Sequence, residues 1–448
     1  MQVDVDRFRF IADALHGVGG FRPVSDGTQV SGDTYLVRYP RESDEKFARR
    51  NQVAWYANDL ASACSRFAGY LSRKPPQRDL QGNPLLTALA DDADWQGNAL
   101  DVFWSRFTTE AKARGAMLLL VDMPRDLGRS LADQLTERSM PYLAMIHPEQ
   151  VTTLTLDDHN RIELVEIDGG IQEGKQIFRG WDTERWWVRA GEVMIEQGDH
   201  PLGVCPVLGF AESTFPRPGE FAQIADLSKR LFNLRSELDE ILRAQTFSLL
   251  TYQVPADLSY TFDPETLAGQ IGTNNMLVHN GATPTFIAPP EGPARIYLDV
   301  IAQLEEKIRR IGHVVEAPDR AESGVALQIR FQQLNSALAY WARTMEDLER
   351  RMWDVACKWL GLSVVPDVRW DDDYAITDLA SELNVLTAMQ QTGFSDQTLT
   401  AKRQQIVAID FATADDAELS ALIEAEGEVI HEREVDGFQK APSVEDDA

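Results

Sequence analysis

The chain has 448 residues, and 43 Lys and Arg against 71 Asp and Glu give a formal net charge of −28. This length predicts several structural units, and 44% apolar with 25% charged residues is typical of a globular protein, which excludes a disordered chain. No apolar run approaches the roughly 18 residues of a membrane span, and the start MQVDVDRFRF has no signal-peptide pattern. The acidic balance argues against a protein that wraps nucleic acid in positive charge.

The negative charge is concentrated near the C-terminus. Residues 361–448 contain 20 Asp and Glu against 5 Lys and Arg. The rest of the chain is only mildly acidic for its length. The distribution predicts a globular body followed by an acidic C-terminal part.

The first predicted elements are a loop and a helix. Residues 1–40 are Gly-rich and irregular, and we expect a loop or a mobile arm there. Residues 44–73 are predicted as one helix, which Pro75 and Pro76 end. Its apolar face would consist of residues at alternating spacings of three and four, namely Ala54, Ala57, Ala61, Cys64, Ala68 and Leu71.

A strand-rich region follows a second helix. Residues 100–113 are predicted as that helix, and 116–121 as a short buried strand. Between 140 and 210, Val, Ile, Thr and Trp alternate with turn signals. The predicted strands there are 143–146, 151–156, 161–167, 176–179, 185–189 and 192–197.

Two amphipathic helices enclose an irregular segment. Residues 220–250 form a heptad-like pattern that includes Leu227, Leu231 and Leu234. Residues 251–293 break the pattern, and 294–312 are helical again. The apolar side of this second helix is expected to carry Ile296, Val300, Leu304, Ile308 and Ile311.

The strongest periodic signal lies between residues 323 and 360. Apolar residues that include Leu334, Leu338 and Trp341 recur at spacings of four and three, which predicts one helix roughly 55 Å long. Such a helix must pack on other helices of its own chain or of neighbouring copies. A strand at 364–370 and helices at 376–392, 396–409 and 415–435 are expected to follow.

No set of residues points to catalysis or to a bound metal. GxSxG, GxxxxGK[ST] and HExxH are absent. Cys64, Cys205 and Cys357 are far apart and are expected to be buried thiols. Asp371 to Asp373 are more typical of a solvated turn than of a cation site. We therefore expect a chain without enzymatic activity, metal or cofactor.

The order of these parts resembles the portal proteins of tailed bacteriophages. ESDEKFARRNQVAWYANDLASACSRFAGYLSRKPP (42–76) is similar to the first wing helix of that family, and HPLGVCPVLGF (200–210) to the strand that closes the wing sheet. EFAQIADLSKRLFNLRSELDEIL (220–242) and ARIYLDVIAQLEEKIRRIGHV (294–314) resemble the two stem helices. ESGVALQIRFQQL (322–334) resembles the start of the long wing helix, and VVEAPDRAE (314–322) stands in the place of the tunnel loop.

The resemblance implies an α+β portal fold and a division of the chain. The implied parts are an N-terminal arm (1–40), an α/β wing (41–219), a first stem helix (220–250), a small β-containing clip (251–293), a second stem helix (294–313), the tunnel loop (314–322), a long wing helix with a closing strand (323–370), and a helical crown with an acidic tail (371–448).

The resemblance also implies a function. A ring of about twelve copies would sit at one vertex of the capsid in the virion, after assembly in the host cytoplasm. Double-stranded DNA would pass through the ring during packaging and ejection. Its partners would be the terminase large subunit, a head-completion or tail adaptor, and the major capsid and scaffold proteins, with no membrane involved.

Two sets of residues are candidates for contact with the DNA. The implied tunnel loop would place Val314, Val315, Glu316, Ala317, Pro318, Asp319 and Arg320 at the narrowest point of the channel. Lys307, Arg309 and Arg310 end the second stem helix, and they could face the channel as weak phosphate contacts or form a solvated or salt-bridged face. The helix-packing residues for the ring would be Leu227, Leu231, Leu234, Leu304, Leu334, Leu338 and Trp341.

Two other functions remain open from the sequence. In a coiled-coil scaffold or adaptor protein, residues 323–360 would form a dimer or trimer seam. An acid–base hydrolase would have a deep carboxylate-lined pocket between residues 140 and 210.

Overall fold

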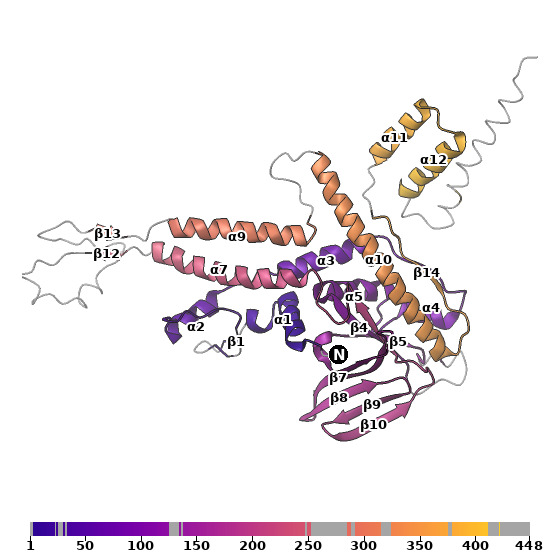
Figure 1. Cartoon of the computed structure of the whole chain (residues 1–448), viewed down its shortest axis with the longest axis horizontal. Coiled ribbons are helices and arrows are strands. Elements are labelled where there is room, and N and C mark those ends of the chain that lie inside the picture. The colour runs from indigo at the N-terminus through magenta and orange to yellow at the C-terminus, as the bar shows by residue number, and fades with distance from the viewer. Residues whose placement is uncertain are drawn as a thin grey trace, which may run out of the picture. The chain divides into compact units, whose positions relative to one another are not determined.

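The computed structural model describes residues 3–22, 24–25, 30–31, 34–124, 134–135, 138–246, 249–251, 285–287, 292–314, 324–374, 379–410 and 421. The chain has an α+β fold, in which helices combine with antiparallel sheets (Figure 1). It divides into two compact units, Met1–Tyr374 and Ala375–Ala448. Within the described ranges, no helix is long and apolar enough to cross a membrane.

The N-terminal segment contains a helix, so the expectation of an irregular arm over 1–40 is wrong there. Helix α1 (Val5–His16) begins at Asp4, whose carboxylate accepts a hydrogen bond from Arg7 N. Its buried face is part of the main core and consists of Phe8, Ile11, Ala14 and Leu15. A 3₁₀ turn (Gly19–Phe21) and the short strands β1 (Val24–Ser25) and β2 (Val30–Ser31) follow.

The predicted helix over 44–73 is two helices. Helix α2 (Asp44–Val53) ends where Ala54 adopts an extended conformation, and α3 (Asp59–Leu71) starts after Asn58, whose side chain accepts from Ala61 N at 3.0 Å. Between them, the Tyr56 ring stacks on Phe21 with 4.0 Å between centroids. The cap and this packing outweigh the helical spacing.

A three-stranded antiparallel sheet lies in the centre of the core. Its strand order is β11 (Val207–Ala211), β4 (Ala116–Asp122) and β5 (Tyr142–Ile146). Helix α5 (Leu100–Arg114) leads directly into β4, as predicted, and α4 (Pro84–Asp91) precedes it. The predicted buried strand is confirmed, because every residue from Ala116 to Val121 is buried.

A five-stranded antiparallel meander forms the second sheet, and the predicted strands are confirmed. Its strands are β6 (Val151–Leu156), β7 (Ile162–Gln172), β8 (Lys175–Trp181), β9 (Arg185–Ala190) and β10 (Val193–Asp199), with a 3₁₀ turn (Pro148–Gln150) before them. Strands β6 and β7 bury Leu154, Val165 and Ile167 in the core, while β10 is an edge strand whose side chains are nearly all exposed.

Two long helices follow the sheets. Helix α7 (Ala222–Thr246) and helix α9 (Gly292–Ile311) lie side by side (Figure 1). Strands β12 (Leu249–Thr251) and β13 (Thr285–Ile287) pair next to the ends of these helices. Most of the segment expected to be the clip, 251–293, lies outside the described residues.

The long helix is confirmed as α10 (Gly324–Leu360), and it packs on its own chain. The predicted seam is buried from Leu334 to Val355 against α3, β4 and β11. A short strand, β14 (Asp367–Arg369), pairs with β3 (Gln77–Asp79) beside it. Because the body of the same chain covers this seam, it is not available for the coiled coil of the scaffold hypothesis.

The C-terminal unit contains two of the three expected helices. Helices α11 (Leu379–Gln391) and α12 (Asp396–Asp410) pack against each other. Among the side chains of α12 that the structure describes, those of Leu399 and Ile406 are buried. The helix expected at 415–435 lies outside the described residues.

Candidate functional site

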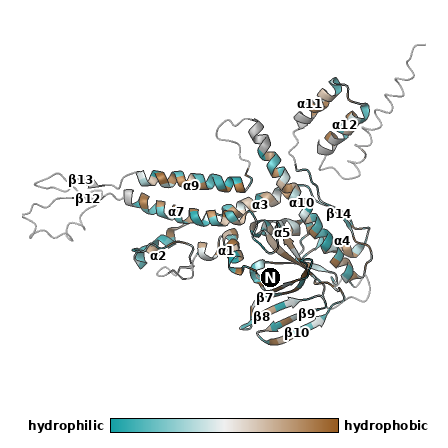
Figure 2. Ribbon diagram, viewed as in Figure 1, coloured by the Kyte–Doolittle hydropathy of each residue, from teal (hydrophilic) through white to brown (hydrophobic). Residues whose placement is uncertain are grey.

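The pair of helices α7 and α9 is held together by an apolar seam. Apolar residues alternate with hydrophilic ones along both helices (Figure 2). The buried side chains of the pair include Leu231, Leu234 and Leu238 of α7 and Ala294, Ile301 and Ile308 of α9. Leu227 and Leu304 are half-buried against the same core. These predicted packing residues therefore lie within one chain, and their contact with other copies stays a prediction.

Polar contacts fix the register of the pair on its two flanks. On one flank, Arg235 forms an ion pair with Glu305 at 2.7 Å, and its guanidinium lies over the Trp55 ring at 4.7 Å from the centroid. We call this side the Trp55 flank. On the other side, the Tyr297 flank, the Tyr297 hydroxyl donates to Glu237 Oε2 at 2.8 Å. Both contacts join α7 to α9.

Cationic side chains gather where α9 ends. Lys307 and Arg310 are exposed, and Arg309 is ion-paired with Glu306 at 3.2 Å. Arg66 of α3 lines a small pocket together with Gly312, His313 and Val314, which places it beside this end of α9. Burial raises the pKa of the Asp59 carboxyl, while Arg235, Arg66 and Arg309 act to lower it. The predicted phosphate-contact residues are thus at the surface, next to a cation that the sequence did not single out.

The end of α9 rests on the body of the chain. A side chain at Gly312 would meet Ala63 Cβ of α3 at 3.2 Å. The backbone of Val314 donates to Arg309 O at 2.9 Å. Of the predicted tunnel loop only Val314 is described; Val315, Glu316, Ala317, Pro318, Asp319 and Arg320 lie outside the described residues.

A buried lysine lies at the root of the helix pair, in a cage of aromatic rings. The Lys112 ammonium is 4.6 Å from the Phe67 ring centroid, 4.4 Å from Phe221 and 4.8 Å from Trp341, and it is ion-paired with Glu212. The cage joins α3, α5 and α10 to the segment just before α7. Sequence analysis missed Lys112, although its spacing of four and eight from Thr108 and Trp104 places it on a buried helix face.

Glu212, the partner of Lys112, holds together several segments at the base of the helix pair. Its Oε1 accepts from Trp341 Nε1 at 3.1 Å, and its Oε2 accepts from Glu220 N at 3.0 Å. Its backbone oxygen accepts from the Tyr340 hydroxyl at 2.7 Å. One residue thereby connects the end of strand β11, the segment just before α7 and the middle of α10.

A second buried carboxylate attaches the strand pair β3–β14 to α10. Glu349 is fully buried, and it accepts from Trp353 Nε1 at 3.2 Å and from Trp370 Nε1 at 2.8 Å. Arg78 of β3 forms an ion pair with the same carboxylate. Because every partner is a strong donor, the charge is compensated inside the core.

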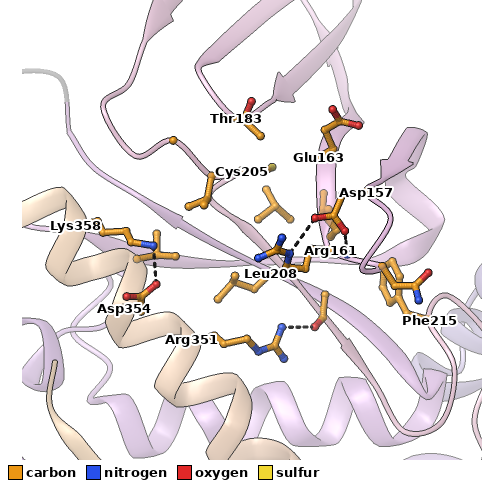
Figure 3. A pocket seen from close by; sticks show the side chains of 17 residues that line it. Asp157, Arg161, Glu163, Thr183, Cys205, Leu208, Phe215, Arg351, Asp354 and Lys358 are labelled. Carbon is orange, nitrogen blue, oxygen red and sulfur yellow. Dashed lines mark hydrogen bonds and ion pairs between the residues drawn. The ribbon is translucent and has the colours of Figure 1, made fainter.

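A cavity of about 510 Å³ lies between α10, β11 and the start of β7 (Figure 3). Lys358 pairs with Asp354 at 2.8 Å at its edge. Backbone hydrogen bonds from Arg161 and His159 lower the pKa of Asp157, as expected for a carboxylate that stabilises the β6–β7 turn. Burial raises the pKa of the Cys205 thiol to about 12, so it is protonated at neutral pH. This pocket is therefore lined by two ion pairs, Asp157–Arg161 and Asp354–Lys358, by the exposed carboxylate of Glu163 and by a protonated thiol, which does not favour thiolate chemistry.

The three cysteines match their expectation, because Cys64, Cys205 and Cys357 are all buried and free. In the described part of the chain, no three His, Cys, Asp or Glu side chains are grouped so that they could hold a metal ion.

Comparison with known proteins gave structural likenesses only. No protein-family model matches the chain, and no curated protein matches it. A solved structure of the virion of a native gene transfer agent particle contains a chain with a TM-score of 0.46 and 13% identity, over 89% of this chain and 98% of that one. A chain in the neck of the empty particle, computed with C6 symmetry, has a TM-score of 0.44 and 13% identity, over 78% of this chain and 89% of that one. A chain in the neck of the native particle, computed with C12 symmetry, has a TM-score of 0.43 and 12% identity over the same shares. Similarity at this level carries no argument about function, which must come from the residues of the chain itself.

Proposed function

We propose that this chain is the subunit of a portal-type ring through which double-stranded DNA is packaged and ejected. About twelve copies would form the ring at one capsid vertex in the virion. Terminase, and later a head-completion or tail adaptor, would dock on it, and capsid and scaffold proteins would surround it. The proposed role is mechanical, with no reaction catalysed by the chain.

The observation that carries the proposal is the end of the helix pair. In a chain of net charge −28, the exposed cations Lys307 and Arg310 lie in the last turns of α9, and the exposed Arg66 of α3 lines a small pocket with Gly312 and Val314, just before the predicted tunnel loop. Cations bind phosphate without regard to sequence. A few of them on an acidic background would contact passing DNA without holding it, as a conduit requires.

The sequence resemblance supports the same function. The strand-rich region, the helix pair and the long helix follow one another along the chain in the order that the portal family has. The rival scaffold hypothesis depended on a free seam in α10, and that seam is buried within the chain. The hydrolase hypothesis depended on a deep carboxylate-lined pocket, and two of the three carboxylates that line the pocket, Asp157 and Asp354, are held in ion pairs.

Two measurements test the proposal. Electron micrographs of the purified protein should show rings with a central channel when viewed along the ring axis. Fluorescence anisotropy with a short DNA duplex at low salt should show weak binding by the ring, with an affinity that falls steeply as salt is added.

Charge reversal identifies the DNA contact. The double variant Lys307→Glu/Arg310→Glu should lose this binding, whereas Arg185→Glu, an exposed cation of β9, should not. Each phosphate contact removed should flatten the slope of log K against log salt by about 0.9. A protein without rings, or a double variant that binds DNA like the wild type, would overturn the proposal.

A further inference from the structure

Helix α9 ends in a Schellman cap that has a histidine at the position where glycine is usual. His313 N donates to Arg310 O at 3.3 Å. Val314 N donates to Arg309 O at 2.9 Å, which is the six-residue bond that closes such a cap. His313 lies between these bonds in the left-handed conformation, with a φ of +50°. A side chain strains this conformation, so the strain persists only because other contacts hold the residue in place.

The contacts that hold His313 are made by its imidazole. The centroid of the imidazole lies 6.2 Å from that of the Phe221 ring, and the two planes are inclined by 32°. Phe221 is fully buried, and it also carries the Lys112 ammonium 4.4 Å from its centroid. His313 lines a small pocket together with Leu334 of α10 and Phe67, which is another wall of the lysine cage. The cap of α9 is therefore fastened to the base of the helix pair by a half-buried histidine beside a buried cation.

The surroundings of the imidazole favour its neutral form. The titratable side chains that face it are Glu220, Lys112, Glu212, Arg66 and Tyr70. Burial lowers the pKa of His313, and the Lys112 ammonium lowers it further, while the carboxylates of Glu220 and Glu212 raise it without outweighing these effects. A protonated imidazole would lie near the caged ammonium in a place that water reaches poorly. An added proton therefore favours a conformation in which the imidazole has moved into water.

We infer that His313 is a pH-dependent switch, in which protonation of the imidazole opens the cap at the end of α9. Above about pH 6.5 the neutral imidazole stays on Phe221 and holds the left-handed backbone in place. Below that pH the open conformation binds the proton more tightly than the closed one. Release of the strained backbone favours the same change. The inference does not depend on the ring of subunits in the proposed function, although in that ring the switch would act directly before the predicted tunnel loop.

Hydrogen exchange followed by mass spectrometry measures the opening of the cap in the full chain. The amides of Gly312, His313 and Val314 report on it, because each donates a hydrogen bond in the closed conformation. Exchange rates at about pH 7.5 and about pH 5.5 are divided by the intrinsic rates, so that only the opening equilibrium is compared. With an open-state pKa of about 6.5, the protection of these amides should fall by up to about tenfold at the lower pH. The amides of the buried strand β4 should keep their protection.

Two variants distinguish this switch from a general loss of stability. His313→Asn cannot take up the proton, and asparagine tolerates the left-handed conformation, so its cap should have the same protection at both pH values. His159→Asn, at an exposed histidine of the turn between β6 and β7, is the matched control and should behave like the wild type. If the wild-type cap keeps its protection at the lower pH, or if His313→Asn loses as much as the wild type, the inference is wrong. An equal loss of protection in β4 would also refute it, because the whole body would then be opening.

Discussion

The caged lysine makes a quantitative prediction about stability. In Lys112→Met the side chain keeps its length and still fills the space between Phe67, Phe221 and Trp341, but the ammonium is lost. Glu212 then keeps two donors, Trp341 Nε1 and Glu220 N, and loses its only buried cation among the described partners.

The expected magnitude follows from the burial of this pair. The side chains of Lys112 and Glu212 are 2% and 13% exposed, so water can replace little of the lost contact. Removing one partner of a buried pair costs about 3–5 kcal/mol. Because Glu212 retains two donors and methionine packs well against rings, we expect about 3 kcal/mol for Lys112→Met. In Lys112→Met/Glu212→Gln the remaining charge is also removed, and the double variant should lose about 1.5–3 kcal/mol less than the sum of the single variants.

Urea unfolding followed by tryptophan fluorescence measures these values. Lys358→Met is the matched control, because the side chains of the Lys358–Asp354 pair are 40% and 49% exposed and the loss of the pair should cost less than about 0.5 kcal/mol. A cost for Lys112→Met no larger than that of the control would show that the cage does not stabilise the fold. If the losses in unfolding free energy of the two single variants add up to that of the double variant, Lys112 and Glu212 do not act as a pair.

Two further predictions concern the backbone and pH. Gly115→Ala should abolish soluble expression, because the new Cβ would lie 1.9 Å from Gly219 N at a φ of +78°. Gly203→Ala is the control: it has a similar φ of +66° but open space around it, so thermal denaturation should show a loss of only about 1 kcal/mol in unfolding free energy. Burial lowers the pKa of His147 and of His313, so the unfolded chain takes up these protons at a higher pH than the folded one. Stability should therefore fall as the pH drops below about 6.5, and His147→Gln/His313→Gln should flatten the dependence of the melting temperature between about pH 7 and 5; an unchanged profile in the double variant would contradict this cause.

Periodicity predicted the elements whose local pattern and packing agree. Helix α10 runs for 37 residues because its apolar spacing is unbroken and its seam is covered by one body from Leu334 to Val355. The meander from β6 to β10 was predictable because turn residues separate strands of uniform composition. In these elements each local preference points to the same structure as the fold does.

Prediction failed where contacts between distant segments decide the structure. The break at Ala54 depends on Tyr56 stacking on Phe21, which no local window contains. The second helix of the pair was expected to have one apolar side, whereas Ile308 is buried against the body and Ile296 is exposed. The spacing of apolar residues in a sequence does not distinguish a helix face that is buried against the same chain from one that is exposed to solvent.

The candidate site was predictable only in part. The cations at the end of α9 could be located from their position in the helix, but Arg66, which lies beside Gly312 and Val314, comes from a segment more than 200 residues away. Lys112 and Glu212 are 100 residues apart, and only the fold brings them together. Trp55 was assigned to a helix interior, so its exposure could not be foreseen.

The carboxylate of Glu212 has a mechanical consequence. It accepts hydrogen bonds from Glu220 N, just before α7, and from Trp341 in the middle of α10, so neither helix can slide without stretching a hydrogen bond to this carboxylate. Helix α7, with 25 residues, extends about 37 Å from this anchored end. A force applied to the far end of this helix would bend the helix along its length, because the contacts of Glu212 hold its start in place. The helix therefore behaves like a cantilever, a beam held at one end: its start is fixed to the core, and its far end is the part that can be displaced.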